Sequence, residues 1–445
     1  MRFLALRALL ALLVLLAASP PALAQDGPDE ESDTDAEAED EAEPEAAPGP
    51  EAAPEPTAAP RTEPDAKPAA DLVEPATASP GGGDESGRSW SLSGYLQPQV
   101  GMTYRPSALP RDRLVYGASA TSAGIEITGN PWDHWAYDVH LIVAGESQEV
   151  VTAVESVDTN GDGVPDDVSA ETETTPSLLV ERATISYQPI AAFGVVIGQM
   201  RIPFTAQEQS PETALMFPQR SGPNEVFLKG PDLGGLAVLS LKGDLLRASL
   251  GAFNGSGAPV EEGDERGLVY SARVDANPLG PFPFGEGDLE RGRLRIGLGA
   301  GFLYYPAKVY DASGYLGSRI RDLRSSASFR LAARGLYLQA EVLRRQRTDS
   351  LSSRPVVATG AYGQGSYFLP IQAPIGLAPI ARVGYSAEDQ GFDPRKTLYL
   401  EAGITVYPRP DQPDELKVVA QYLGERRLTE GEDAHGAILQ LQLLW

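Results

Sequence analysis

The chain has 445 residues, of which 62 are acidic and 36 are basic, and it has no cysteine. The absence of cysteine excludes disulfides, thiolate metal sites and cysteine nucleophiles. The net charge of −26 is concentrated near the N-terminus, because residues 25–88 hold 20 acidic and three basic residues, whereas residues 89–445 hold 42 and 31. Neither part has a basic face that would neutralise phosphates, so nucleic acid is excluded as a partner.

Residues 1–24 have the pattern of a cleaved signal peptide. Arg2 and Arg7 precede an apolar run over residues 8–18, and residues 22–24 supply an Ala-Leu-Ala cleavage site. The run is too short to span a bilayer as a helix, and no later apolar stretch is long enough to do so. We therefore expect an exported protein that meets a membrane with strands rather than helices.

Residues 25–88 consist almost entirely of Ala, Pro, Glu and Asp and end near the glycine run 81–83. Such a segment buries too little apolar surface to offset its ordering entropy, so we expect a disordered linker. Proline and like-charge repulsion favour an extended chain. Its role is open between an inert spacer and a periplasmic tether or cation-attracting tail.

From residue 89 onward, apolar and polar residues alternate over stretches of about ten residues, as they do in transmembrane strands. In the last stretch, Leu439 and Leu441 share one face, Gln440 and Gln442 share the other, and Trp445 closes the strand. A soluble sandwich would turn the apolar face to a core, whereas a barrel turns it to lipid. The alternation alone does not choose between them.

The links between strands favour the barrel. Links after odd-numbered strands are long, such as 147–176, 202–231 and 306–322, and links after even-numbered strands are tight, which is the rim asymmetry of outer-membrane barrels. Link 277–291 is long where a tight turn is expected, so either that turn is decorated or the strand count slips there. The prediction is an all-β, antiparallel transmembrane barrel over residues 89–445, in the bacterial outer membrane. Its sixteen predicted strands are 90–104, 112–128, 134–146, 177–189, 192–201, 232–241, 245–254, 266–276, 292–305, 323–332, 335–347, 355–368, 376–387, 396–407, 414–425 and 434–445.

A more specific pattern lies within the first half of this region. Residues 180–187 read Val-Glu-Arg-Ala-Thr-Ile-Ser-Tyr, residues 198–205 read Gly-Gln-Met-Arg-Ile-Pro-Phe-Thr, and residues 251–255 read Gly-Ala-Phe-Asn-Gly. This resembles the phosphate-selective porin O and P family, in which the loop after a similar strand folds into the pore. The resemblance implies a 16-stranded porin, a homotrimer, and passage of small anions through a basic constriction. The sequence departs from the family at Pro231, which stands in a basic position, and in its net acidic barrel region.

Sixteen strands enclose an aqueous channel, so the favoured function is passive diffusion of small polar solutes or inorganic ions through a porin. The family resemblance implies that anions such as phosphate are among them. The loop 202–231 is the expected constriction, where charged groups set selectivity. The basic candidates would favour anions. The predicted selectivity residues are Arg201, Arg220, Lys229, Glu208, Glu212 and Glu225.

Residues 158–167 place side-chain oxygens at every second position, as calcium-binding loops do. The loop 158–169 is similar to thrombospondin type 3 calcium repeats, although Ser169 stands where a bidentate acid is usual. We expect Ca²⁺ binding there, on the extracellular side, and no cofactor requirement for the barrel itself. The expected ligands are Asp158, Asn160, Asp162, the carbonyl of Val164, and Asp166.

Catalysis is not expected, because His134, His140 and His435 are the only histidines and none lies in a nucleophile or metalloprotease motif. The alternative to a porin is a non-conducting adhesion or structural barrel with a calcium-binding surface loop. Conductance in a planar bilayer separates the two. In either case the lipid bilayer is the principal partner.

Overall fold

The computed structural model describes residues 89–108, 113–157, 167–255, 265–310, 316–352, 354–370, 375–389, 394–410, 412–413 and 415–445. The predicted signal peptide, the linker and the calcium ligands Asp158 to Asp166 lie outside these residues. None of the helices in the described ranges is long and apolar enough to cross a membrane.

The described residues form one antiparallel sheet of 17 segments and three short helical turns. The strands are β1 (Ser89–Tyr104), β2 (Leu114–Trp132), β3 (Trp135–Val157), β4 (Asp167–Ile190), β5 (Phe193–Arg201), β6 (Pro231–Leu241), β7 (Leu246–Phe253), β8 (Glu265–Arg266), β9 (Val269–Ala276), β10 (Arg295–Tyr310), β11 (Leu316–Ala333), β12 (Leu336–Asp349), β13 (Val356–Tyr367), β14 (Gly376–Asp389), β15 (Pro394–Tyr407), β16 (Leu416–Arg427) and β17 (Glu432–Leu444). The helical turns are α2 (Ala206–Gln209), the 3-10 turn η2 (Glu212–Ala214) and α3 (Gly222–Glu225).

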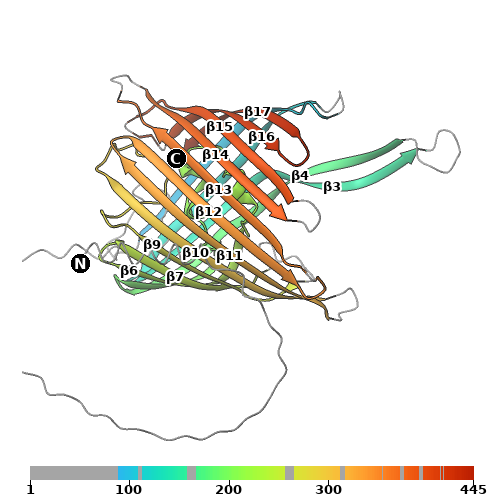
Figure 1. Ribbon diagram of the computed structural model, residues 1–445. Coiled ribbons are helices and arrows are strands. Elements are labelled where there is room, and N and C mark those ends of the chain that lie inside the picture. The colour runs from blue at the N-terminus through green and yellow to red at the C-terminus, as the bar shows by residue number, and fades with distance from the viewer. Residues whose placement is uncertain are drawn as a thin grey trace, which may run out of the picture. The chain divides into compact units, whose positions relative to one another are not determined.

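The sheet closes on itself, because β1 pairs with both β2 and β17 (Figure 1). Segments β8 and β9 both pair with β10 and are two pieces of one strand, so the barrel has 16 strands, as predicted. Trp445 follows the end of β17, and its backbone N–H and C=O each bond to Gly94 at 3.0 Å. Closure satisfies the strand edges that an open sheet would leave unpaired.

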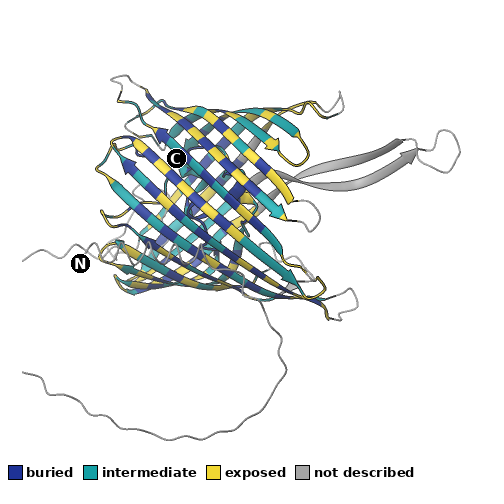
Figure 2. Cartoon of the chain, in the orientation of Figure 1, coloured by how far each residue is buried: buried dark blue, intermediate teal, exposed yellow. Residues whose placement is uncertain are grey.

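Side chains alternate between buried and exposed along the strands, which gives the wall the banded pattern in Figure 2. On β11, Leu323 and Phe329 are 40% and 38% exposed, whereas Arg324 and Arg330 are buried on the lumen side. A closed sheet whose outer face is apolar and whose inner face is polar is stable in a lipid bilayer. The alternation predicted from sequence is therefore confirmed as a lipid-facing and a lumen-facing set.

The links differ between the two rims of the barrel. One rim carries the short turns 133–134, 191–192 and 334–335, and we call it the turn rim; the opposite one is the loop rim. Two links predicted to be long are instead mostly strand, because β3 and β4 stay paired as far as Val157 and Asp167, and β10 and β11 leave only five residues between them. Both β3 and β4 are rich in β-branched residues there, which favours continued pairing.

Two links fold toward the lumen instead of staying at a rim. The first joins β5 to β6 and contains α2, η2 and α3; we call residues 202–230 the inner loop. The second joins β9 to β10 at the turn rim; we call residues 277–294 the insert. For the long link 277–291, the sequence left two explanations, an enlarged turn or an error in the strand count. The structure shows an enlarged turn, and the number of strands is as predicted.

Candidate functional site

Buried arginines bind the two ends of the inner loop to the wall. Arg273 on β9 donates to the Phe204 carbonyl at 2.8 Å, and Arg324 on β11 donates to the Phe227 carbonyl at 2.5 Å. Each guanidinium also pairs with an aspartate two residues away on its own strand, at 2.6 and 2.7 Å. The charge of each arginine is therefore neutralised, and its remaining donors fix the loop.

The middle of the inner loop is held in the same way. Lys417 on β16 donates to the Thr213 carbonyl at 2.8 Å, and Arg382 on β14 donates to the carbonyls of Gln219 and Arg220 at 3.0 and 3.2 Å. Arg382 also pairs with an acid on β15 at 2.5 Å. Basic side chains that would attract anions in an open lumen thus serve here as anchors of loop carbonyls.

Aromatic side chains of the inner loop fill one side of the lumen. Phe204 and Phe227 are buried in an apolar cluster with inward residues of β5 to β13, and Phe217 packs in a second cluster with Phe282 of the insert. Burying one such side chain stabilises the arrangement by roughly 1.5–3 kcal/mol. The inner loop is therefore a packed element and not a flexible flap.

Wall glycines make room for this packing. A Cβ on Gly301 of β10 would collide with the Phe204 carbonyl, and a Cβ on Gly384 of β14 would lie 2.8 Å from the Pro223 side chain. Both glycines face the lumen at positions that the inner loop covers. Side chains there would push the loop off the wall.

The insert supports the inner loop from the turn rim. The Glu286 carboxylate accepts bonds from Gln207 Nε2 at 3.0 Å and from the Met216 N–H at 2.9 Å. The Glu286 N–H donates in turn to the Ala214 carbonyl at 2.9 Å. Glu286 is buried, so these bonds are shielded from water and replace its hydration.

The insert is itself fixed to the wall. The Arg330 guanidinium of β11 lies 4.7 and 4.6 Å from the ring centroids of Phe282 and Phe284, and it donates to the Pro283 carbonyl at 2.8 Å. Buried Asp288 accepts the N–H of Gly335, from the tight turn between β11 and β12, at 2.7 Å. Wall, insert and inner loop therefore form one connected unit on this side of the lumen.

The part of the chain that the structure describes encloses two cavities beside the filled side. The first, of about 370 Å³, lies between residues 208–213 of the inner loop and the inward faces of β1 to β5, and it extends to Glu415 and Trp445 at the turn rim. The second, of about 690 Å³, lies nearer the loop rim and is bounded by β1, β2, β16, β17 and Gln219. Both cavities follow β1, so they lie one above the other along the same part of the wall.

Four buried polar side chains lie between the two cavities, and we call them the glutamine girdle: Gln97, Ser122, Gln440 and Gln442. Gln97 donates to Gln442 at 2.7 Å and accepts from Ser122 at 2.6 Å, and Gln442 donates to the Thr213 carbonyl at 3.0 Å. The Nε2 of Gln440 is buried with no hydrogen-bond partner among the described residues. An unmet buried donor costs about 1–3 kcal/mol, which water in the girdle would relieve.

A β-bulge in β4 turns two consecutive charged side chains toward the first cavity. In the β3–β4 ladder, His140 pairs with Arg182 and Leu141 pairs with Val180, so Glu181 is the extra residue. Glu181 and Arg182 both line the cavity. In a regular strand one of the two would point to lipid.

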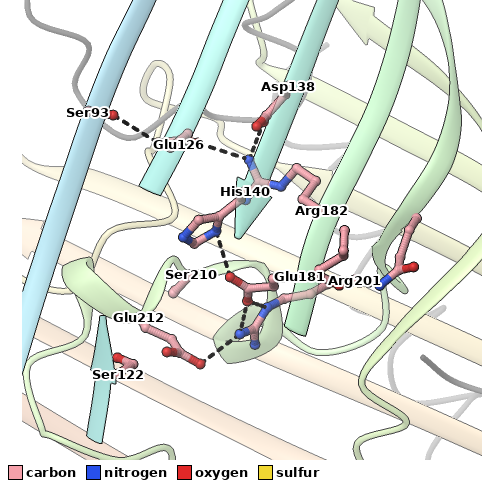
Figure 3. Close-up of polar contacts among 12 residues, drawn as sticks. Ser93, Ser122, Glu126, Asp138, His140, Glu181, Arg182, Arg201, Ser210 and Glu212 are labelled. Atoms are coloured by element: carbon pink, nitrogen blue, oxygen red, sulfur yellow. Dashed lines mark hydrogen bonds and ion pairs between the residues drawn. The ribbon is translucent and has the colours of Figure 1, made fainter. Parts of the chain in front are cut away.

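Charged side chains from β2, β3 and β4 form a first ion-pair group beside the cavity (Figure 3). Arg182 lies 2.5 Å from Asp138 and 3.6 Å from Glu126, measured between nitrogen and carboxylate oxygen. Ser93 on β1 donates to Glu126 at 3.5 Å. One arginine thus faces two acids, and the group carries excess negative charge.

A second group joins the wall to the inner loop (Figure 3). Glu181 lies 2.7 Å from His140 Nδ1 and accepts from Arg201 Nε at 2.5 Å. Arg201 also pairs with Glu212 at 2.8 Å, and Glu212 pairs with Arg220 at 3.3 Å. Neither arginine therefore presents an unpaired positive charge to the cavity.

The structure separates the six predicted selectivity residues into two groups. Lys229 lies apart from the first cavity, with its ammonium 3.5 Å from the ring centroid of Tyr305, and Glu225 is exposed on α3. The other four line the first cavity or contact its lining; they are Arg201, Glu208, Glu212 and Arg220.

The lining of the first cavity is acidic overall. Only two arginines and one histidine oppose its carboxylates, and low-dielectric walls strengthen the resulting field. The acids in the lining are Glu126, Glu181, Glu208, Glu212 and Glu415, and the basic groups are Arg182, Arg201 and His140.

Apart from Arg201, the wall residues of this site were not among those predicted from sequence. Glu126 and His140 each stand between two apolar residues inside a predicted strand, which is the signature of a lumen-facing position. Glu126 and His140 could therefore have been predicted from the sequence. Glu181 and Arg182 could not, because an alternating pattern does not reveal a β-bulge.

Among the described residues, no three His, Asp or Glu side chains are grouped so as to hold a metal ion. The predicted calcium ligands lie outside those residues, so that prediction stays as it was made.

No family model and no curated protein matches this chain in sequence. Solved structures do match it in fold. The outer-membrane channel DcaP of Acinetobacter baumannii aligns with a TM-score of 0.51 at 11% identity, covering 82% of this chain and 100% of its own. OmpT, an outer-membrane protein of Vibrio cholerae, aligns with a TM-score of 0.50 at 10% identity over 82% and 100%. OprB of Pseudomonas putida aligns with a TM-score of 0.50 at 12% identity over 80% and 94%.

The fold is that of the outer-membrane β-barrels among these structures. The similarity covers nearly all of the barrel, and at these identities it concerns the fold alone. The predicted outer-membrane β-barrel is confirmed.

Proposed function

We propose that this chain is an outer-membrane porin that lets small polar solutes and ions diffuse through the two cavities beside β1. The proposal rests on the polar lining of the two cavities along β1, where several buried polar atoms have no hydrogen-bond partner among the described residues. Tyr95 Oη, His140 Nε2 and Gln440 Nε2 are buried without a hydrogen-bond partner among the described residues, which favours water along this route.

The channel is narrow in this proposal, because the inner loop and the insert fill the opposite side of the lumen. The girdle and the Thr213 carbonyl form its tightest point. Single-channel recording in planar bilayers tests the proposal, with small, steady conductance steps as the expected result.

We further propose that the channel prefers small cations. The resemblance to phosphate-selective porins implies anions, but the arginines that would attract them are engaged with acids and loop carbonyls. Arg273, Arg324 and Arg382 each have a carboxylate partner within 2.7 Å. The acids of the first cavity outnumber its basic groups, and one exposed unit charge at about 8 Å shifts an ion by about 0.5 kcal/mol in water.

This preference is expected to depend on pH through Glu208 of the inner loop. Burial raises the pKa of Glu208 to about 7, although Arg201, Arg220 and Arg324 oppose that rise. Below that pH the carboxyl is neutral, and as the pH rises through it the cavity gains one negative charge. The cation-to-anion permeability ratio should therefore increase from pH 6 to pH 8, by about twofold to fivefold.

Reversal potentials under a KCl gradient measure this ratio. Glu208→Gln should give a ratio that is flat over the same interval, and a wild-type ratio that falls with pH would contradict the assignment. The same shift affects folding: the folded state keeps the proton longer than the unfolded state, so this contribution to stability is present at low pH and is lost as the pH rises through about 7.

A non-conducting structural barrel is the second candidate, favoured by how completely the inner loop and the insert fill one side of the lumen. In that case the cavities would be blind pockets, and reconstituted protein would give no current steps. The same recording therefore separates the two candidates.

We also propose calcium binding at the predicted loop 158–169, whose ligands stand at alternate positions in the sequence. Titration of the purified barrel with Ca²⁺ should saturate at or below about millimolar concentration, as extracellular calcium modules do. Asp158→Asn combined with Asp162→Asn should abolish the heat signal in isothermal calorimetry. Loss of this site would leave the conductance unchanged.

A homotrimer, which the family resemblance implies, stays a prediction. Small outward residues support close approach of another barrel on one stretch of the wall. There Ala118, Ala420 and Ala437 border a shallow apolar groove over β1, β2, β16 and β17.

A further inference from the structure

A cluster of basic side chains stands on the outside of the barrel at the loop rim of β10, β11 and β12. Lys308 and Arg319 are direct partners in the β10–β11 ladder, and Arg321 is two residues along β11 on the same face. Arg344 lies on the neighbouring β12, in register with Ser325, which is four residues along β11 from Arg321. All four are exposed and alternate with buried lumen-facing residues, so they point away from the lumen. We call these four residues the outer basic patch.

The patch lies where the lipid-facing apolar surface ends. Going along the outward face of β11 toward the loop rim, Phe329 and Leu323 come first and Arg321 and Arg319 follow. On β12, Val342 is 56% exposed and Arg344 is the next outward residue. Long basic side chains at this height lay their stems on apolar surface and reach the headgroup region with their charge.

The charges of the patch are not balanced within the described part of the protein. No carboxylate among the described residues forms an ion pair with any of the four, although most inward arginines have one. Like charges directly opposite each other on a sheet are destabilising, and Lys308 and Arg319 are such a pair. An external anion at this height would remove the repulsion.

Outer-membrane barrels carry short turns on the periplasmic side, so the loop rim is the outer one. We propose that the outer basic patch binds the phosphate groups of a glycolipid in the outer leaflet of the outer membrane. Guanidinium groups bind phosphate through two parallel hydrogen bonds, and the two arginines of β11 are spaced to engage one headgroup together. The apolar face below the patch would hold the acyl chains. The patch faces lipid and not the lumen, so this site is independent of the proposed channel function.

The test measures, by microscale thermophoresis, the binding of diphosphorylated lipid A to the full-length barrel in detergent. The variant R319Q/R321Q should weaken binding by about tenfold to thirtyfold, since each basic group near a charged headgroup contributes on the order of 1 kcal/mol. The matched control is R395Q/R426Q, which removes two exposed loop-rim arginines that already pair with Glu430 and Asp433. It should bind like wild type.

Three results would overturn the proposal. If R319Q/R321Q bound lipid A with wild-type affinity, the two arginines would not be part of the binding site. Equal binding of dephosphorylated lipid A would assign the affinity to the apolar wall alone. Displacement of the lipid by an excess of inorganic phosphate would make the patch a free-anion site. Heat-modifiable electrophoretic mobility shows that each variant is folded, and unchanged conductance of R319Q/R321Q shows that the channel is intact.

Discussion

Replacing residues 278–292 of the insert with a two-residue turn is expected to raise the single-channel conductance severalfold and to make the current noisier. The insert supplies the Glu286 carboxylate that holds Gln207 and Met216, and it supplies the Phe282 ring that packs in the same cluster as Phe217. Without it, the buried Met216 N–H loses its acceptor and Gln207 Nε2 keeps only the Gln364 oxygen at 3.4 Å; a buried donor left unmet costs about 1–3 kcal/mol. The inner loop then moves away from its present position, and the free cross-section grows.

Point variants make this test sharper than the deletion alone. Glu286→Ala should reproduce part of the conductance increase, and Glu286→Gln should have a smaller effect, because its carbonyl still accepts one of the two bonds. Glu290→Gln is the matched control, since Glu290 is an exposed carboxylate of the same insert. Wild-type conductance in both the deletion and Glu286→Ala would show that the insert does not support the constriction.

Neutralising Glu212 is expected to turn the channel from cation preference toward anion preference. Glu212 is the shared partner of Arg201 and Arg220, so Glu212→Gln removes one negative charge and leaves two guanidinium groups less compensated. A change of one unit charge at about 8 Å alters cation and anion concentrations about twofold in opposite directions. The cation-to-anion permeability ratio should fall by about fivefold.

The reverse change should come from the arginines. R201Q/R220Q is expected to raise the cation-to-anion permeability ratio, because Glu181 and Glu212 then face the cavity without their arginine partners. Glu225→Gln is the matched control for Glu212→Gln: it removes one acid from the same loop at a position outside the cavity lining. If Glu225→Gln shifted the reversal potential as much as Glu212→Gln, the field would come from the loop as a whole and not from the cavity.

The sequence predicted the barrel because its signals are local. Alternation with a period of two is a property of each strand by itself, and it gave sixteen strands whose number the structure confirms. Arg201, Glu208, Glu212 and Arg220 were predicted as one group, since the last three lie within one loop and Arg201 lies at its base. The insert was recognised as an exception in link length, although not as a lumen element.

The remainder depends on contacts between residues far apart in the chain. Glu286 meets Gln207 across 79 residues, and Arg382 meets Gln219 across 163. No sequence pattern shows that these partners face each other. The bulge at Glu181 likewise appears only in the register of β3 with β4. The use of wall arginines as loop anchors, which argues against anion passage, was for this reason not predictable.

The central claim is a narrow, cation-preferring channel along β1. Planar bilayers that contain the purified barrel and separate two KCl concentrations test it most directly, because one recording gives both conductance and reversal potential. We predict small single-channel steps and a reversal potential of the sign that K⁺ permeation produces. The absence of steps, or a reversal potential of the sign that Cl⁻ permeation produces, would contradict it.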